Sequence, residues 1–176
     1  MSAIDRKALD IWIHGIGQGD RDALAQLYRA SSAPIYAYAF SILKNRHDAE
    51  DVLHDCFVTV CTSAESYQSQ GKPMAWLLTV ARNLCYKRLR EQKRDIRFAE
   101  RGFADDPVLD AETRLLLGSC MAQLGDEEHQ IVVLHVVAGM KHREIGAYLQ
   151  LPLSTVLSRY NRAIRKLNTY YRKECR

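Results

Sequence analysis

Apolar residues recur every three to four positions along most of the chain, a spacing typical of amphipathic helices. No stretch shows the period-two alternation of a half-buried strand. The pattern therefore predicts an all-α protein. The expected helices lie before the glycines at 15, 17 and 19, over 20–30, 35–44, 48–60, 74–92, 111–124, 127–137 and 141–149, and from 154 onward.

Polar residues and helix breakers indicate where these segments begin and end. Asp20 and Asp48 are suited to begin helices, and Pro34 and Pro73 are expected near the first turns of theirs. Residues 65–72 are polar and predict a loop, whereas 93–110 are charged and lack a sustained apolar period. We therefore expect two small helical domains joined by a linker. The predicted divisions are an N-terminal extension at 1–19, a first domain at 20–92, the linker at 93–110 and a second domain at 111–176.

Residues 141–171 carry the most informative pattern. Ile145, Tyr148 and Leu149 form an apolar stripe on a short helix, which is expected to stop before Pro152 because a residue preceding proline avoids the helical region. Ser154 is a candidate N-cap for the next helix. Two helices joined by a tight turn predict a helix-turn-helix unit, whose second helix would enter the major groove of DNA.

The second helix of this unit has two contrasting faces. Its apolar face carries Val156, Tyr160, Ala163, Ile164 and Leu167, and the opposite face carries Thr155, Ser158, Arg159, Arg162, Arg165 and Lys166. Arginine pairs bidentately with guanine, and hydroxyl and ammonium groups suit phosphates. The alternative is a solvated surface helix. It is disfavoured because no Asp or Glu lies at helical spacing to offset the repulsion among the cations.

Composition and charge narrow the function classes. The 176 residues are 47% hydrophobic, which suits packed domains, and the net charge of +4 is unevenly placed. Residues 48–51 and 105–112 are acidic and residues 87–97 and 159–176 are basic, which favours nucleic acid on the basic surfaces and a basic protein partner on an acidic one. No signal peptide and no apolar run of membrane-spanning length is present, so we expect a soluble cytoplasmic protein without membrane insertion.

The five cysteines lack the spacing of a metal site. They are expected to be reduced thiols of a cytosolic protein. A redox role for Cys56 and Cys61 stays open beside plain packing in the core. We find no phosphate-cradling glycine loop and no nucleophile–base pair, so no catalytic residue, metal ligand or cofactor is expected.

Two stretches together carry a family resemblance. The segments DAEDVLHDCFVTVC (48–61) and MAWLLTVARNLCYKRLR (74–90), followed by REIGAYLQLPLSTVLSRYNRAIRKL (143–167), resemble the two conserved domains of bacterial RNA polymerase sigma factors of the extracytoplasmic-function (ECF) class of the sigma-70 family. The resemblance spans about residues 20–170, and the two domains in this order are more specific than either alone. It implies a region 2-like first domain and a region 4-like second domain.

The resemblance implies a protein that binds core RNA polymerase, directs it to two-box promoters and helps to melt the DNA, with no covalent chemistry of its own. It implies that the helix starting at residue 48 docks on the clamp helices of the largest polymerase subunit. The residues implied are Asp48, Glu50, Asp51, His54 and Asp55. Acids in a first helical turn also favour the helix dipole, which is a simpler explanation that does not extend to Asp55.

The resemblance also implies where promoter DNA binds. The loop at 64–72 is expected to capture a flipped base, with Tyr67, Gln68 and Gln70 as candidates. Trp76 is expected in the core, with a place at the edge of the melted strand as the alternative. Arg82, Asn83, Lys87, Arg88 and Arg90 are expected to hold the DNA backbone near the melting point. The upstream box would be read as duplex through Thr155, Ser158, Arg159 and Arg162.

Four positions depart from the family pattern, so the promoter preference does not transfer. Tyr86 stands at a usual aspartate, Leu157 at a usual basic residue, Gln150 at a usual glycine and Gly125 at a usual proline. The resemblance also implies an anti-sigma protein as a partner. Two alternative functions remain at this point: a helix-turn-helix regulator that acts without polymerase, and a sigma-like adaptor that binds an anti-sigma protein without touching DNA.

Overall fold

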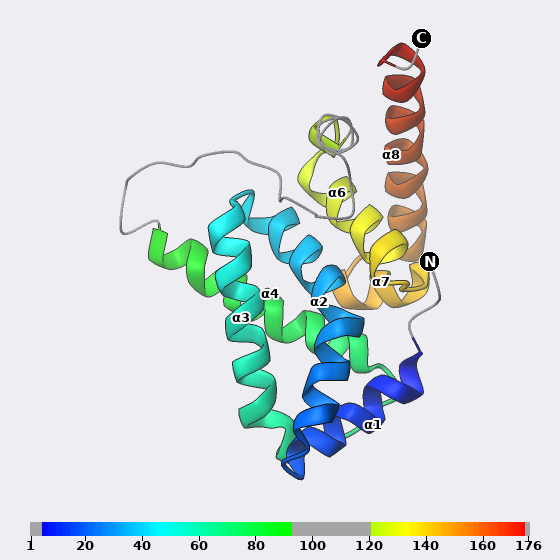
Figure 1. Cartoon of the computed structure of the whole chain (residues 1–176). Helices are drawn as coiled ribbons and strands as arrows, with labels where there is room; N and C mark the ends of the chain where they lie inside the picture. Colours follow the sequence, from blue (N-terminus) through cyan, green and yellow to red (C-terminus); the bar gives the residue numbers. More distant parts are fainter. Residues whose placement is uncertain (1–4, 93–120, 175–176) are drawn as a thin grey trace.

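The structure is a computed structural model that describes residues 5–92 and 121–174. Within these ranges the chain forms helices and turns and no strand (Figure 1). The predicted all-α fold is confirmed. The predicted linker at 93–110, and the helix predicted from residue 111 up to residue 120, lie outside the described residues.

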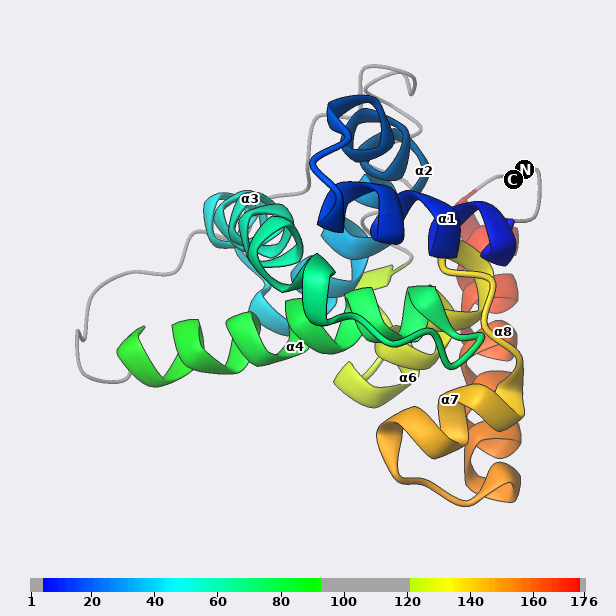
Figure 2. The same ribbon diagram turned by 90° about the horizontal axis from the view of Figure 1, so that it is seen from below.

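The first half of the molecule is a bundle of four helices. They are α1 (Arg6–Gly17), α2 (Arg21–Leu43), α3 (Arg46–Ser63) and α4 (Pro73–Gln92), with a short 3₁₀ turn, η1 (Ala64–Ser66), after α3. Helix α4 runs across both α2 and α3, and α1 lies against the N-terminal half of α2 (Figures 1 and 2). As predicted, α4 begins at Pro73, whose missing N–H costs nothing at a first helical position.

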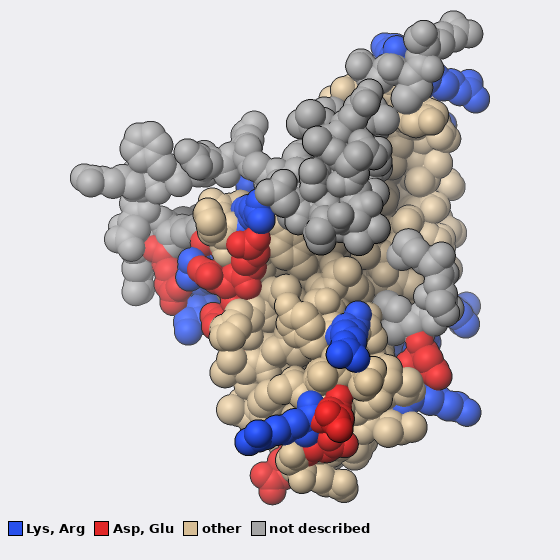
Figure 3. Space-filling model, viewed as in Figure 1, with Lys and Arg blue, Asp and Glu red and all other residues tan. Residues whose placement is uncertain are grey.

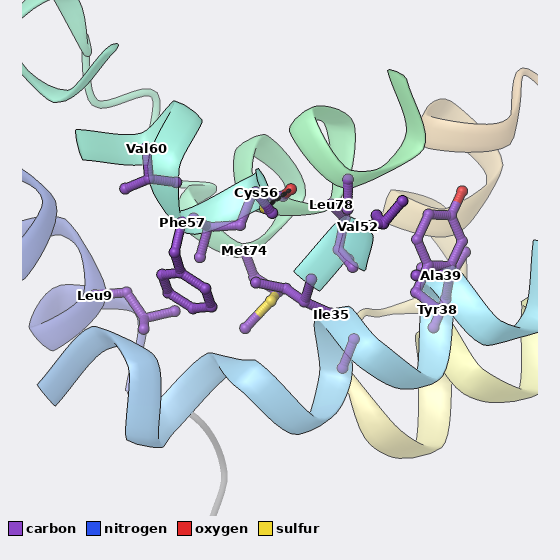
Figure 4. Close-up of a cluster of buried hydrophobic side chains, with 14 of the residues drawn as sticks. Leu9, Ile35, Tyr38, Ala39, Val52, Cys56, Phe57, Val60, Met74 and Leu78 are labelled. Atoms are coloured by element: carbon purple, nitrogen blue, oxygen red, sulfur yellow. Dashed lines mark hydrogen bonds between the residues drawn. The ribbon is translucent and has the colours of Figure 1, made fainter. Parts of the chain in front are cut away.

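All four helices contribute to one buried apolar cluster (Figure 4). Its fully buried members include Leu9, Ile13, Leu27, Ile35, Tyr38, Cys56, Val60, Leu77 and Leu78. On α3 the residues buried in this cluster are Val52, Cys56, Phe57 and Val60, which share one face of the helix. In α1 the buried residues are Leu9, Ile13 and Ile16, whereas Ile11 is 68% exposed.

The prediction of two separate helices over 20–30 and 35–44 is wrong, because α2 is one continuous helix that contains Pro34. A proline inside a helix removes one backbone hydrogen bond and costs about 3 kcal/mol. Leu27, Ile35 and Tyr38, all fully buried on the same helix, more than offset that cost at roughly 1.5–3 kcal/mol per large apolar side chain. Tertiary burial therefore overrides the local breaker.

The start of α3 lies slightly before the predicted one. Asn45 is the N-cap, and its side-chain oxygen accepts a hydrogen bond of 3.1 Å from the backbone N–H of Asp48. The N-cap predicted for the long final helix is also displaced, because that helix begins at Leu153 and Ser154 lies within its first turn. Asp20 caps α2 as predicted, accepting from the backbone N–H groups of Asp22 and Ala23.

The second half of the molecule follows the region that the structure does not describe. It contains α6 (Asp126–Val132), a π-helical continuation η2 (Val133–Val137), α7 (His142–Leu149) and α8 (Leu153–Glu174). Gly139 ends the segment with a positive φ of 68°, as expected of a glycine stop. The second half lies beside the C-terminal part of α2, with α6 and η2 packed on that helix (Figure 1).

The two halves share one apolar core. Ile131, Leu134 and Ile145 of the second half are fully buried in the same cluster as the residues of the four-helix bundle. A separate cluster within the second half contains only Leu124, Val132 and Ala163 as buried members among the described residues. The helix-turn-helix unit is therefore held against the bundle by apolar packing.

Candidate functional site

The predicted helix-turn-helix unit is formed by α7, a tight turn and α8. Gln150 adopts the left-handed conformation at the end of α7, with φ at 57°, in the place where the resemblance expects a glycine. Gly146 makes the turn compact, since a Cβ added to it would lie 2.9 Å from the carbonyl oxygen of Leu151. The close approach of the turn to α7 therefore depends on this glycine, and it fixes how α8 leaves the turn.

Helix α8 has the two faces that its sequence predicts. Val156 and Ala163 are fully buried, and Tyr160, Ile164 and Leu167 are half-buried beside them. On the opposite side Ser158, Arg162, Arg165 and Lys166 are exposed, whereas Thr155 and Arg159 are half-buried. The structure therefore brings the six predicted DNA-contacting residues of α8 onto one broad, largely accessible surface.

The cations of this surface have acidic partners that the periodicity of α8 did not reveal. The guanidinium Nη1 of Arg159 lies 2.6 Å from a carboxylate oxygen of Glu127. The Nζ of Lys166 donates to Glu128 at 2.7 Å, and the Nε of Arg162 lies 3.9 Å from the same carboxylate. The expectation that the repulsion among these cations goes uncompensated is wrong, because the compensating acids come from α6 rather than from α8 itself.

Glu128 is the anchor of this charge network. It is 6% exposed, and it also accepts a hydrogen bond of 3.1 Å from the backbone N–H of Gly125 at the start of α6. The hydrogen bond from Lys166 lowers the pKa of Glu128, so its carboxylate stays charged. Lys166 is consequently held beside α6, and Arg162, with 62% of its side chain exposed, lies near the same carboxylate.

Asn161 on α8 was not among the DNA contacts predicted from the sequence, although it lies beside them. It is exposed, one turn beyond Leu157 and Ser158, on the side of α8 away from Val156 and Ala163. The sequence reading sorted cations and hydroxyls and passed over a neutral amide. The helical spacing from Ser158 was the signal that would have found it.

The acidic residues of α3 fall into a paired group and an accessible group. Asp48 is 8% exposed and accepts a hydrogen bond of 2.8 Å from the Nε of Arg88, whose Nη2 donates to Asp51 at 2.6 Å. Glu50 accepts from Arg46 at 2.8 Å, and His54 and Asp55 are exposed. These acids and their basic partners gather over the N-terminal half of α3 (Figure 3).

Arg88 links the two predicted sites of the first half. It was assigned to DNA on α4, yet its guanidinium bridges two predicted polymerase-binding acids on α3. The hydrogen bond to Asp48 raises the pKa of Arg88, which keeps the bridge charged at every physiological pH. Asn83, Lys87 and Arg90 remain exposed on α4.

Arg82, the remaining predicted DNA contact of α4, lies at the junction of the two halves. Its guanidinium carbon is 5.4 Å from the ring centre of Tyr86 and 5.7 Å from that of Tyr148 on α7. Its Nη1 lies 3.5 Å from the backbone oxygen of Tyr148. In this structure Arg82 therefore takes part in packing between the halves.

Of the three base-capture candidates in the loop after α3, Tyr67 is not free to stack on a base. Tyr67 is 8% exposed, packs against the ring of Trp76 at 4.7 Å and donates its hydroxyl hydrogen to Asp10 at 2.5 Å. Burial and this hydrogen bond raise the pKa of the Tyr67 hydroxyl. Gln68 and Gln70 are the candidates of this loop that stay exposed. Trp76 is half-buried against the core, as expected.

Comparisons with known proteins agree with this geometry. Residues 27–95 match the family profile of Sigma-70 region 2, and residues 114–167 match that of Sigma-70, region 4. The ECF RNA polymerase sigma factor SigK of Mycobacterium sp. (strain KMS) is 31% identical over 170 residues, covering 90% of this chain and 88% of the relative. The chain belongs to the ECF RNA polymerase sigma factors. It directs RNA polymerase to promoters and is not an enzyme.

Further relatives of this sigma factor include the ECF RNA polymerase sigma factor SigW of Bacillus subtilis (strain 168), which is 26% identical over 174 residues, covering 88% of this chain and 93% of the relative. Among solved structures, the sigma factor RpoE in complex with the anti-sigma factor NepR from Bartonella quintana has a TM-score of 0.69 at 20% identity, covering 84% of this chain and 96% of that one. The structure of CnrH in complex with the cytosolic domain of CnrY has a TM-score of 0.63 at 23% identity, covering 92% of this chain and 96% of that one. At these identities the structural likeness concerns the fold.

Polar contacts add to the apolar packing between the two halves of this sigma factor. The guanidinium of Arg6 donates to both carboxylate oxygens of Glu144 on α7, at 2.8 and 2.9 Å. The Tyr148 hydroxyl donates to the backbone oxygen of Leu78 at 2.8 Å, and the Lys44 Nζ lies 2.8 Å from the His129 Nδ1. Arg6 lies on α1, outside both family profiles, and the sequence reading gave it no role.

Metal binding, membrane insertion and cysteine reactivity are the remaining properties of the described residues. Across 5–92 and 121–174 no group of three His, Cys, Asp or Glu residues is arranged to hold a metal ion, and no helix has the length and apolarity to cross a membrane. Cys56 is buried and Cys61 exposed. Burial raises the pKa of the Cys56 thiol to about 12, which disfavours the reactive thiolate that a redox role would require.

Proposed function

We propose that this sigma factor divides its work among three surfaces. The exposed acidic part of α3 docks on the clamp helices of the largest subunit of core RNA polymerase. The exposed side of α4, with Asn83, Lys87 and Arg90, holds the promoter backbone where the strands separate. Helix α8 enters the major groove of the upstream promoter box.

Asp55 is the observation that carries the docking assignment. It is exposed and lies beyond the first turn of α3, where interaction with the helix dipole has faded. Asp48 is buried and Asp51 is tied to Arg88, so both already serve the fold. Asp55 forms no ion pair with a described residue, which leaves its carboxylate available to a basic partner together with His54, whereas Glu50 is exposed but paired with Arg46.

The charge on α4 and α8 supports the DNA assignments. Lys87 and Arg90 are exposed on α4, and Arg165 is exposed on α8. Phosphate neutralisation by such side chains supplies affinity without sequence preference and weakens as salt rises. Base preference must then come from other residues of α8 that face the groove.

We extend the proposal to the setting in which the protein acts. Core polymerase and promoter DNA place its work in the cytoplasm. Two structures with the same fold are those of CnrH in complex with the cytosolic domain of CnrY and of the sigma factor RpoE in complex with the anti-sigma factor NepR. An anti-sigma protein is accordingly proposed as a further partner of this chain.

The docking assignment is tested with Asp55→Lys and the matched control Asp22→Lys, an exposed acid on α2. Affinity for core RNA polymerase is measured by competition with unmodified protein, and transcript starts are mapped in vitro. Asp55→Lys is expected to bind polymerase roughly five- to tenfold more weakly, since a like charge is brought against a basic surface. Asp22→Lys is expected to bind normally. Equal affinity of Asp55→Lys and the unmodified chain would contradict the docking surface.

A further inference from the structure

A continuous ridge of exposed side chains runs along α8 at intervals of four residues. It consists of Leu153, Leu157, Asn161 and Arg165, and all four are exposed. Leu153 and Leu157 keep 40% and 39% of their surface accessible, which leaves apolar area in water without a partner. Ser154 and Ser158 lie beside the ridge. Buried Val156 and Ala163 set the rotation of α8 that keeps the ridge exposed.

Of the arginines beside this ridge, Arg159 is held closely by α6, whereas Arg162 keeps 62% of its side chain exposed. Arg159 lies 2.6 Å from Glu127, and Arg162 lies 3.9 Å from Glu128. A guanidinium that is paired with a carboxylate must break that pair before it can offer two donors to guanine. The N-terminal part of α8, which in this type of unit meets the base edges, therefore presents a leucine, hydroxyls and an amide more readily than a free cation.

These neutral groups have a definite base preference. In the major groove the Asn amide donates to N7 of adenine and accepts from its N6 amino group, and an apolar side chain contacts the C5-methyl group of thymine. Leu157 and Asn161 are separated by about 6 Å along the helix axis, close to two base-pair steps of about 3.4 Å. The two side chains thus suit positions two base pairs apart in one short A·T-containing site.

We propose that Leu157 and Asn161 set the base preference of this sigma factor at the upstream box, Leu157 through a thymine methyl group and Asn161 through an adenine. The resemblance treated Leu157 as a lost basic contact, whereas its exposure on the ridge gives it a role of its own. Arg165, whose Nε donates to the backbone oxygen of Asn161 at 3.3 Å, lies next along the ridge and is placed to meet the phosphate backbone. This inference rests on the proposed entry of α8 into the groove.

The test uses the full chain bound to core RNA polymerase. Footprinting on promoters found by mapping transcript starts first locates the upstream box. Each thymine of that box is then replaced by uracil, which removes only the C5-methyl group, and each adenine by 7-deazaadenine, which removes only N7. The unmodified chain is expected to lose about fourfold in affinity at one uracil and about tenfold at one 7-deazaadenine.

The variants assign these losses to residues. Leu157→Ala is expected to bind thymine and uracil equally at the sensitive position, and Asn161→Ala to bind adenine and 7-deazaadenine equally. Asn168→Ala, an exposed asparagine two turns further along α8, is the matched control and should keep both sensitivities. Unchanged thermal unfolding of all three variants would show that the fold is intact.

The outcomes separate this inference from the function on which it rests. A box that is protected equally well with and without the methyl groups and N7 atoms would overturn the readout alone. Sensitivity that persists in Leu157→Ala and Asn161→Ala would assign it to other residues and overturn the inference as well. Absence of any protected upstream box would overturn the entry of α8 into the groove, and the readout with it.

Discussion

Each of the helices α1, α2, α3 and α4 contributes fully buried apolar side chains to a single cluster, whereas the cluster that belongs to the second half alone has three buried members among the described residues. The larger apolar residues of the second half, such as Leu134 and Ile145, are buried in the cluster that both halves share. The four-helix bundle thus supplies most of the shared core, and the helix-turn-helix unit completes its core on the bundle. A family profile that treats the two as separate regions does not reveal this dependence.

The largest loss of unfolding free energy is expected from Leu134→Ala, which removes a side chain from the shared core. Leu134 is fully buried in the shared core, and removing such a side chain costs about 2–5 kcal/mol of unfolding free energy. Both tryptophans, Trp12 and Trp76, lie in the first half, so their fluorescence reports on the bundle while circular dichroism reports on all helices. In urea titrations the two signals are expected to change together in the unmodified chain and at a lower urea concentration in Leu134→Ala. Helix loss that clearly precedes the fluorescence change in the unmodified chain would contradict a shared core.

A second way to weaken the contact between the halves is to lower the pH. Burial, with a smaller contribution from the nearby Lys44 ammonium, lowers the pKa of His129 to about 4 from an ordinary value of 6.5. Between these values the unfolded chain takes up a proton that the folded chain does not, so stability is complete above pH 6.5 and falls as the pH drops towards 4. The loss amounts to roughly 3 kcal/mol if the full difference is expressed.

His129→Gln is expected to remove most of this pH dependence, and His47→Gln, at an exposed position on α3, is expected to keep it. The measurement is the free energy of unfolding in urea at pH 7 and pH 4.5, with the His129 ring titrated by NMR. A His129 pKa near 6.5 would refute the explanation.

The smallest loss of unfolding free energy is expected from Arg6→Ala. Arg6 binds Glu144 through two hydrogen bonds, but its side chain is 42% exposed, so water screens the pair and its loss should cost no more than about 1 kcal/mol. Faster amide hydrogen exchange in α7 is a more sensitive measurement of the same loss. Lys7→Ala, one residue along α1, should leave the exchange of α7 unchanged. Identical exchange in both variants would show that the Arg6–Glu144 pair does not hold α7 in place.

The sequence predicted the features that follow from local spacing, such as buried helix faces and helix starts. It missed the features that depend on packing against residues far away in the chain. The helical period placed the buried face of α8, and Pro73 marked the start of α4. Pro34 misled because a local breaker does not report the burial of Leu27, Ile35 and Tyr38 on the same helix. The domain boundaries proposed from composition stay predictions.

The same limit applies to the candidate surfaces. The acidic residues of α3 and the cations of α8 were found from their spacing, but spacing within one helix contains no information about Arg88 or Glu128 on another. Tyr67 was a candidate for base capture until its hydroxyl proved to be bonded to Asp10. Which residues of each surface remain accessible is therefore a property of the packed helices.

The Arg88 bridge has a consequence for the evolution and engineering of this sigma factor. One guanidinium links Asp48 and Asp51 on α3 to α4, so the surface proposed for polymerase and the helix proposed for promoter melting share a residue. Substitutions chosen to retarget either surface will show epistasis through Arg88. Libraries that vary α3 and α4 together, with Arg88 among the varied positions, should therefore yield functional variants that are inaccessible when one helix is varied at a time.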